Sequence, residues 1–296
     1  IAIKDASDAI LWSWHVWVTD EDINNVIEIT NHQNVKYNFM PVNLGQCDGN
    51  TITYEERSCK VKFIAGDQSK EITIKQLANV IATGSNAPFY QWGRKDPLYP
   101  SNGMGNTTKI WYDKEGIPST ANPMKGTFSA GNDCIKNCIL NPNLMHNRYN
   151  GDYTYYNLWS ADNKTTSAND NPVNKTIYDP CPVGFKLPAS NAFTGFTTTG
   201  ESVSSSTQVN GTWSSSEKGW YFYTNSEKTQ SIFFPALGYR SYSTMRPGSI
   251  GTQGCFWSAH PVAKGNNYYL RTSSVDVQPT YMVDRGFGYA LRPCQD

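Results

Sequence analysis

Residues 254–259 read Gly-Cys-Phe-Trp-Ser-Ala, and residues 266–274 read Asn-Asn-Tyr-Tyr-Leu-Arg-Thr-Ser-Ser. Both runs are short and contain the aromatic side chains typical of strands, and Pro261 and Gly265 between them are typical of turns. Similar short runs occupy residues 219–224, 230–238 and 288–293. Because turn residues separate them every 8–12 residues or so, they predict antiparallel strands in the C-terminal third of the chain.

The preceding part of the chain predicts a mixture of strands, short helices and long loops. Alternating or apolar runs predict strands at 10–18, 37–44 and 60–66. The stretches at 100–130 and 199–218 are rich in Gly, Ser, Thr, Asn or Pro and predict surface loops. Together with the C-terminal strands, this pattern predicts an α+β fold with twisted antiparallel strands.

Three segments predict short helices. In 71–82, the side chains of Ile72, Leu77, Val80 and Ile81 would share one helical face. A second helix is expected around Cys134–Leu140, ending before Pro142. A third is expected after Ser190, the candidate N-cap, with Phe193 and Phe196 three residues apart on its face.

The composition indicates a folded, loop-rich protein. The chain has 296 residues with no internal repeat and no clear linker, so we treat 1–296 as one domain. Aromatic residues make up 13% and the formal net charge is zero, which argues against disorder and against a nucleic-acid-binding surface. No apolar run is long enough to span a bilayer. The chain begins at Ile1 within an apolar alternation, so we expect it to be part of a longer, processed protein.

Catalytic signatures are not recognisable in the sequence. It has no HExxH, Walker, dinucleotide-binding or G-x-S-x-G motif. His15, His32, His146 and His260 are scattered: we expect a hydrogen-bonded structural role for His15 and an exposed contact role for His260. Carboxylates are too evenly scattered to nominate a glycosidase pair. We therefore expect a protein that is not an enzyme.

Seven cysteines leave at least one thiol without a partner inside the chain. Candidate bridges join Cys47 to Cys59 across a polar segment, Cys134 to Cys138 across a turn, and Cys181 to Cys294 beside prolines. Free buried thiols are an equal alternative. Without paired CxxC motifs we expect no metal site. Calcium at Asp162, Asn163 and Asp170 is the less favoured alternative to ordinary solvated side chains.

Seven strings, in this order, resemble one family of bacterial surface domains. They are Leu11–Asp20 (LWSWHVWVTD), Pro41–Gly45 (PVNLG), Phe89–Pro97 (FYQWGRKDP), Lys175–Pro188 (KTIYDPCPVGFKLP), Leu237–Arg240 (LGYR), Gly254–Ala259 (GCFWSA) and Gly288–Cys294 (GYALRPC). Together they are similar to the Fibrobacter succinogenes major paralogous domain, which occurs in Bacteroidales surface proteins and fimbrial tip adhesins.

The resemblance implies a C-type-lectin-like fold, export to the cell surface or a pilus tip, and an N-terminal pilin-like domain upstream. Enzymes with a related fold bind copper through two closely spaced cysteines near the C-terminus. Cys255 and Cys294 are far apart in sequence, and Cys134 and Cys138 lie in another region. The resemblance therefore does not extend to that activity.

The segment 273–289 is similar to the variable region of lectin-fold proteins that are diversified by retroelements. Its mixture of Tyr, Arg and polar residues is typical of binding surfaces. We expect a ligand-binding face to include His260, Val262, Tyr268, Tyr269, Arg271, Asp276, Gln278, Thr280, Tyr281, Val283, Asp284 and Phe287.

These observations predict an adhesin domain that binds a host or bacterial surface protein or glycan. The alternatives are a carbohydrate-binding module with or without calcium, a structural pilus subunit that contacts other subunits, and an unrecognised hydrolase. We expect neither nucleic acid nor a membrane span among its interactions.

Overall fold

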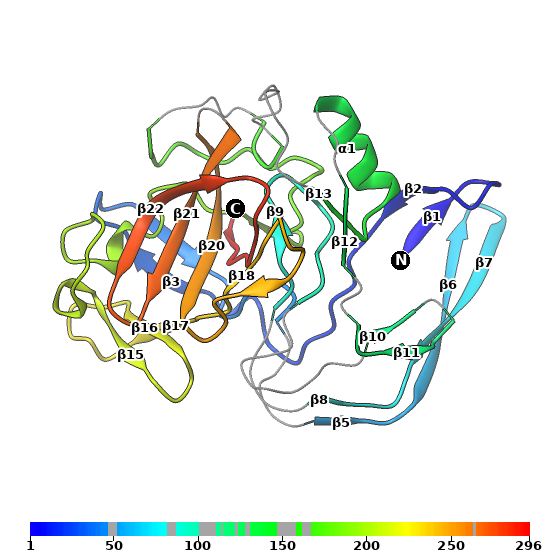
Figure 1. Cartoon of the computed structure of the whole chain (residues 1–296), viewed down its shortest axis with the longest axis horizontal. Coiled ribbons are helices and arrows are strands. Elements are labelled where there is room, and N and C mark those ends of the chain that lie inside the picture. Colours follow the sequence, from blue (N-terminus) through cyan, green and yellow to red (C-terminus); the bar gives the residue numbers. More distant parts are fainter. Residues whose placement is uncertain are drawn as a thin grey trace.

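The computed structural model shows how the predicted strands assemble (Figure 1). It describes residues 1–46, 52–81, 87–100, 111–113, 115–121, 124–127, 131–146, 158–161, 167–262 and 265–296. Strands account for 42% and helices for 6% of the chain described, so the fold is mostly β with little helix. Within those residues, no helix is both long enough and apolar enough to cross a membrane.

A three-stranded antiparallel sheet lies at the centre of the C-terminal part (Figure 1). It consists of β20 (Gln253–Pro261), β21 (Asn266–Ser273) and β22 (Val277–Asp284). All but the first residue of β20 are buried, so both faces of this strand are covered. This explains why its apolar residues Cys255, Phe256 and Trp257 follow one another and do not alternate with polar ones.

The two faces of this sheet contact two different parts of the hydrophobic core. Successive side chains of a strand point to opposite faces. Phe256 and Leu270 accordingly belong to one buried cluster, whereas Trp257 and Tyr269 belong to the other. The sheet therefore separates the interior into two apolar layers.

Stacked phenylalanines fill the first layer. The sheet β15 (Gly211–Ser214), β16 (Gly219–Tyr223) and β17 (Ser231–Pro235) contributes Phe222 and Phe234. The 3-10 helix η1 (Thr194–Phe196) contributes Phe196, whose ring lies 3.9 Å from that of Phe222 at an interplanar angle of 4°. The Phe234 ring then meets Phe256 of the central sheet edge-on at 4.9 Å.

The N-terminal and C-terminal segments of the chain are joined in one sheet. Its order is β14 (Phe185–Lys186), β24 (Cys294–Gln295), β4 (Lys36–Phe39) and β3 (Ile27–Thr30). The fully buried Arg292 locks the junction, because its guanidinium donates hydrogen bonds to Asn43 and to the carbonyls of Met40, Pro41 and Phe233.

A fourth small sheet connects the middle of the chain to the C-terminal segment. Its order is β19 (Pro247–Gly248), β18 (Tyr239–Arg240), β23 (Gly288–Tyr289) and β9 (Tyr90–Gln91). Gly238 precedes β18 with φ +73°, and a Cβ there would lie 2.1 Å from the carbonyl oxygen of Gly248. Only glycine fits this close approach.

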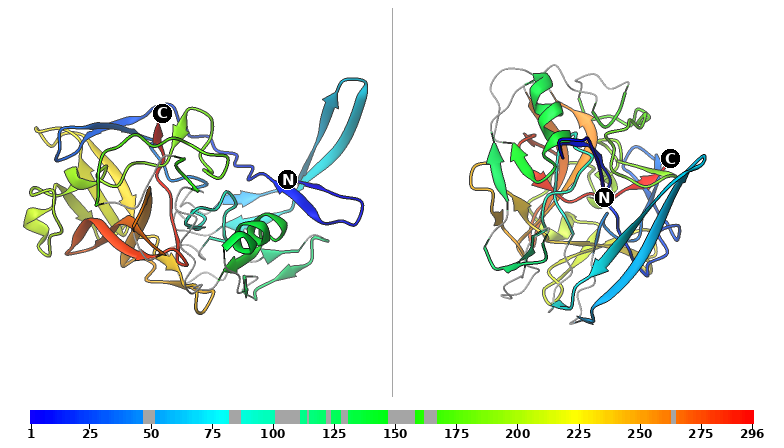
Figure 2. Two further views of the ribbon diagram at one scale, coloured as in Figure 1. Left: turned by 90° about the horizontal axis from the view of Figure 1, so that it is seen from above. Right: turned by 90° about the vertical axis from the view of Figure 1, so that its right-hand side faces the viewer.

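Smaller strand pairs lie around this body. They are β1 (Ala2–Lys4) with β2 (Ile10–Ser13), β5 (Ile52–Tyr54) with β8 (Asn79–Ile81), β6 (Arg57–Ala65) with β7 (Gln68–Gln76), and β10 (Trp111–Tyr112) with β11 (Pro118–Ser119). Figure 2 shows the β6–β7 hairpin projecting from the rest of the molecule. Its side chains are almost all exposed, so its pairing depends on backbone bonds and cross-strand pairs such as Lys60 with Glu71.

The predicted helix at 71–82 is wrong, because residues 68–76 form strand β7. Ile72 pairs with Val61, and Ile74 pairs with Cys59. The alternation of Ile with polar and charged residues therefore favours a strand over a helix. Gly66 supplies the positive φ for the two-residue turn between β6 and β7. The expected strand at 10–18 is also shorter, since β2 ends at Ser13.

The helix expected around Cys134–Leu140 is confirmed as α1 (Gly131–Leu140). The helix expected after Ser190 is only the short η1, and Ser190 does not cap it, since Phe193 holds the N-cap position. The predicted loops contain short elements: β12 (Lys125–Thr127), which pairs in parallel with β13 (Leu144–His146), and the 3-10 helix η2 (Ser206–Gln208). Residues 101–110 of the first loop lie outside the described residues.

Candidate functional site

The structure divides the predicted ligand-binding residues between the interior and the surface. His260, Tyr268 and Tyr269 are buried, with 1%, 8% and 4% of their surface exposed. Tyr281 is 46% exposed. The half-buried remainder is Val262, Arg271, Asp276, Gln278, Thr280, Val283, Asp284 and Phe287. The three buried residues therefore offer little side-chain surface to a partner, and the exposed contact role expected of His260 is wrong.

His260 lies inside strand β20 and not in an exposed loop. Its Nδ1 accepts the backbone N–H of Ser190 at 3.3 Å and lies 3.1 Å from the Ser190 hydroxyl. Burial lowers the pKa of His260 to about 4, although the nearby backbone of Asn171 and the Asp170 carboxylate act in the opposite direction. His260 is thus a neutral structural residue that ties β20 to the 188–191 segment.

A continuous series of aromatic rings runs from the core to the surface on one face of the central sheet. The buried Tyr269 ring lies 4.7 Å from Tyr289, which lies 4.4 Å from Trp257. Burial raises the pKa of Tyr269 and of Tyr289, so both phenols stay neutral. The outer rings continue this series in two directions.

Tyr281 forms one end of the series, since its ring lies 5.7 Å from Tyr269, its partner in the strand register. The other end begins with Phe287, 5.8 Å from Tyr289. Tyr239 and Tyr242 meet the Phe287 ring edge-on at 5.5 and 4.9 Å. Because these outer rings are supported by buried rings, they are held in fixed positions.

A charged pair lies beside Tyr281. The Arg271 guanidinium donates to the Asp276 carboxylate at 3.0 Å and lies 5.9 Å from the centre of the Tyr281 ring. The two charged side chains are 24% and 18% exposed, so both can be reached from solvent. We call Tyr239, Tyr242, Arg271, Tyr281 and Phe287 the aromatic face.

The other predicted residues have more local roles. Gln278 pairs with Arg271 across β21 and β22, and Val283 packs against the second core layer. Asp284 accepts the backbone N–H of Gly286 at 2.8 Å and so shapes the turn that precedes Phe287. Tyr268 is opposite Met282 in the register and therefore lies on the other side of the sheet from Tyr269.

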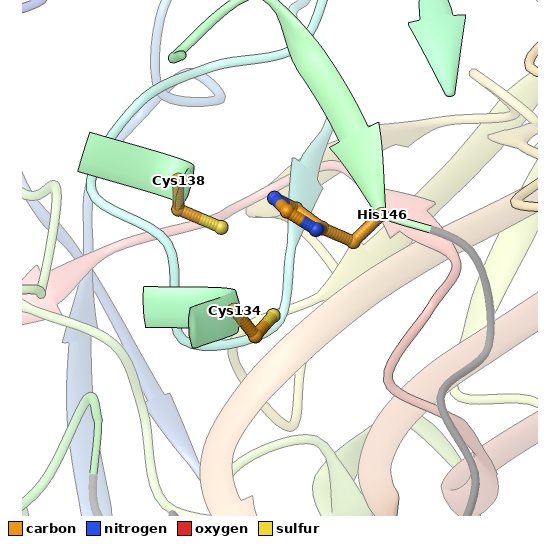
Figure 3. A group of neighbouring side chains, drawn as sticks. All are labelled: Cys134, Cys138 and His146. Carbon is orange, nitrogen blue, oxygen red and sulfur yellow. The ribbon is translucent and has the colours of Figure 1, made fainter. Parts of the chain in front are cut away.

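A second group of chemically active side chains was not predicted. Cys134 and Cys138 of α1 and His146 of β13 bring two sulfurs and an imidazole nitrogen within 4.8 Å of one another (Figure 3). All three line a pocket together with Trp92, Tyr178 and Arg285. Hydrogen bonding from Cys134 and the positive charge of Arg94 hold the pKa of Cys138 well below its usual value, against the opposing effect of burial.

Two residues of the string at 89–97 fix the backbone of this group. Gln91 accepts the N–H of His146 at 2.9 Å, and its amide donates to the His146 carbonyl at 2.8 Å. Arg94 donates to the carbonyls of Leu144 and Pro142 at 2.6 and 2.8 Å. The turn after α1 and strand β13 are thereby tied to Gln91 and Arg94.

The disulfide candidates are not bridged where the structure describes both partners. Cys134 and Cys138 form no disulfide and project from successive turns of α1 toward His146 (Figure 3). Cys181 and Cys294 are buried and form no disulfide, and the Cys181 thiol donates instead to the Asp179 carboxylate. Burial, and then the negative charge of Asp179, raise the pKa of Cys181. Cys59 is a free, exposed thiol, and its predicted partner Cys47 lies outside the described residues.

Of the three residues considered for calcium, the structure describes only Asp170. Asp162 and Asn163 lie outside the described residues. The carboxylate of Asp170 accepts hydrogen bonds from Asn31, Tyr37 and Asn191 at 2.6, 2.7 and 2.8 Å. These donors satisfy Asp170 as a structural residue that joins three segments. His15, as expected, makes a structural hydrogen bond, with its Nδ1 3.0 Å from the Tyr90 hydroxyl.

No protein-family model, no curated protein and no solved structure matches the chain. The function is therefore inferred from the chain's own residues. Two groups of side chains are the candidates for binding: the aromatic face, and the cluster of Cys134, Cys138 and His146.

Proposed function

We propose that this chain is the ligand-binding domain of an exported bacterial adhesin and that it binds its partner through the aromatic face. The observation that carries the proposal is the series of rings ending in Tyr281 and in Phe287, with Arg271 beside the first end. Tyr and Arg are among the residues that contribute most to binding at protein interfaces.

The packing under this face favours binding. Tyr281 rests on Tyr269, and Phe287 rests on Tyr289, both of which are buried. Little side-chain freedom remains to be lost on binding, which lowers the entropic cost of forming a complex. Arg271, already held by Asp276, offers a directional donor to an acidic or carbonyl group of the partner.

The proposal includes the C-type-lectin-like fold and the family that the seven strings resemble. Arg292 of GYALRPC and Gln91 of FYQWGRKDP have structural roles here, since both bind backbone carbonyls far away in sequence. In this proposal the seven strings mainly maintain the fold, with Tyr239 also contributing to the aromatic face, while residues 271–287 supply the part that differs between relatives. The same proposal holds that the domain is displayed at the pilus tip of a Bacteroidales cell and that its variable region is diversified by a retroelement.

The test is binding of the fluorescently labelled domain to cultured epithelial cells, measured as a function of its concentration. Loss of one central aromatic side chain typically costs about 2 kcal/mol of binding energy. Tyr281→Ala and Phe287→Ala should therefore each weaken half-maximal binding by roughly 30-fold. Tyr221→Ala is the matched control, because this half-buried tyrosine bonds to Glu217 on a different sheet. Equal binding by all three variants would reject the aromatic face.

Two rival functions have their own tests. A glycan array probed with and without a chelator tests for a carbohydrate-binding module, and binding that the chelator abolishes would indicate calcium dependence. Deleting the domain in the bacterium tests for a structural pilus subunit. If pili assemble normally while adhesion is lost, the structural role is rejected.

A further inference from the structure

We propose that Cys134, Cys138 and His146 bind a thiophilic cation, with Zn²⁺ as the principal ion. This is a site separate from the aromatic face and does not depend on the adhesin proposal. Within the described part of the chain, it is the one group of three or more His, Cys, Asp or Glu side chains whose ligand atoms converge in this way.

The distances fit such an ion after a small closing movement. Zinc bonds to sulfur at about 2.3 Å and to imidazole nitrogen at about 2.0–2.1 Å. In a tetrahedral site this places two sulfurs about 3.8 Å apart and sulfur and nitrogen about 3.5 Å apart. The ligand atoms here lie within 4.8 Å of one another, and their side chains point to a common centre (Figure 3).

The donor types select the class of ion. Thiolate is a soft ligand that favours zinc, copper(I) or iron–sulfur chemistry, whereas calcium and magnesium require oxygen donors. Two thiolates and one imidazole match zinc well and leave one tetrahedral position for a fourth ligand. The three side chains line the pocket with Tyr178 and Arg285, so water or a small donor molecule can fill that position from the pocket.

The local fold supports the site through the order of its elements. Cys134 and Cys138 are four residues apart on α1 and so share one helical face. The turn after Leu140 reverses the chain, and Leu144 N–H donates to the carbonyl of Asn141. The hydrogen bonds from Gln91 then fix the backbone of His146 opposite the two thiols. The ion would thus bind to a frame that is already in place.

The competing state of the same residues is a disulfide between Cys134 and Cys138. A disulfide requires the two sulfurs at about 2.05 Å, and it would remove both thiolate ligands. In the structure the two sulfurs are not joined by a disulfide. The experiment must therefore separate an ion-bound dithiol from an oxidised pair.

The test uses the whole chain, purified without added metal or chelator. Elemental analysis should find close to one zinc per chain. Mass spectrometry of the peptide that contains Cys134 and Cys138 should give the mass of the dithiol, which is two hydrogens heavier than the disulfide. After removal of zinc and reduction, titration with Co²⁺ should produce the visible bands of tetrahedral cobalt and a thiolate-to-cobalt charge-transfer band.

Three variants locate the site. Loss of a residue that merely supports a metal ligand weakens binding 10–100-fold, so Cys138→Ser and His146→Gln should weaken Co²⁺ binding by on the order of 100-fold or more. Cys59→Ser, which removes an exposed thiol elsewhere, should bind Co²⁺ like the unmodified chain. Thermal unfolding of the metal-free variants should match that of the metal-free parent, which excludes misfolding as the cause.

Two results would overturn the proposal. One is a reduced, folded chain that gives no thiolate-to-cobalt band. The other is a natively purified chain that contains no zinc and has Cys134 and Cys138 bridged. The Tyr281→Ala variant should keep full Co²⁺ binding, so failure of the adhesin proposal would leave this result unaffected.

Discussion

Acidification should destabilise this fold through His260. The residue is 1% exposed, and burial lowers its pKa to about 4. In the unfolded chain a histidine titrates near 6.5. Between these two values the unfolded state binds a proton that the folded state does not bind, so stability is present above about pH 6.5 and falls as the pH falls toward 4.

The size of the effect follows from the shift. A difference of about 2.5 pKa units corresponds to roughly 3.4 kcal/mol when the pH is below both values. At pH 4, where half of the folded molecules are protonated, the loss is about 3 kcal/mol. No reduction for solvent screening is needed, because the imidazole is almost fully buried.

The assay is urea unfolding at several values between pH 7.5 and 4, with the free energy of unfolding obtained by linear extrapolation. His260→Gln keeps an acceptor for the Ser190 N–H but cannot titrate. The parent should lose about 3 kcal/mol more than this variant across the range. His32→Gln, which removes an exposed imidazole, is the matched control. Parallel curves for the parent and His260→Gln would refute the assignment of a buried neutral histidine.

Three other predictions concern the frame. Gly238→Ala should lower the unfolding free energy by about 2–4 kcal/mol, because the new Cβ would clash with the carbonyl oxygen of Gly248 and the positive φ would strain an alanine. The control Gly66→Ala should lower it by only about 1 kcal/mol, because there the φ is also positive but no atom lies near the new Cβ. Phe196→Ala should cost about 3–5 kcal/mol by chemical denaturation, and a smaller loss would contradict its central stacking role. Iodoacetamide should label Cys59 in the native state but Cys255 only after unfolding, because burial raises the pKa of Cys255 to about 12.

The sequence predicted β16, β17, β20 and β21, whereas only residues 288–289 of the strand expected at 288–293 form one, and β7 was predicted as a helix. Turn residues separate β20 from β21, so both strands were evident. In 71–82 a few apolar residues fit a helical face and an alternation equally well, and the cross-strand partner Val61 decided between them. Strand β22 was missed because it contains Pro279, which sits at a register shift on an edge strand, a position that tolerates proline.

The candidate sites were predicted only in part. Arg271, Tyr281 and Phe287 were recognised by composition, whereas Tyr239 of β18 and Tyr242 just after it meet Phe287 only through the tertiary fold. The i, i+4 spacing of Cys134 and Cys138 was visible in the sequence. Pairing them with His146 required the turn and the backbone contacts from Gln91, which depend on tertiary structure.

The pairing of β24 with β4 has a consequence for biosynthesis. Phe39 pairs with Cys294, so the sheet of β14, β24, β4 and β3 cannot be completed until residue 295 has been synthesised. Contacts between such distant residues slow folding because a long loop must be closed before they form. This sheet is therefore expected to form only after residues 1–295 have all been made, which leaves a long interval in which a chaperone can bind the incompletely folded part.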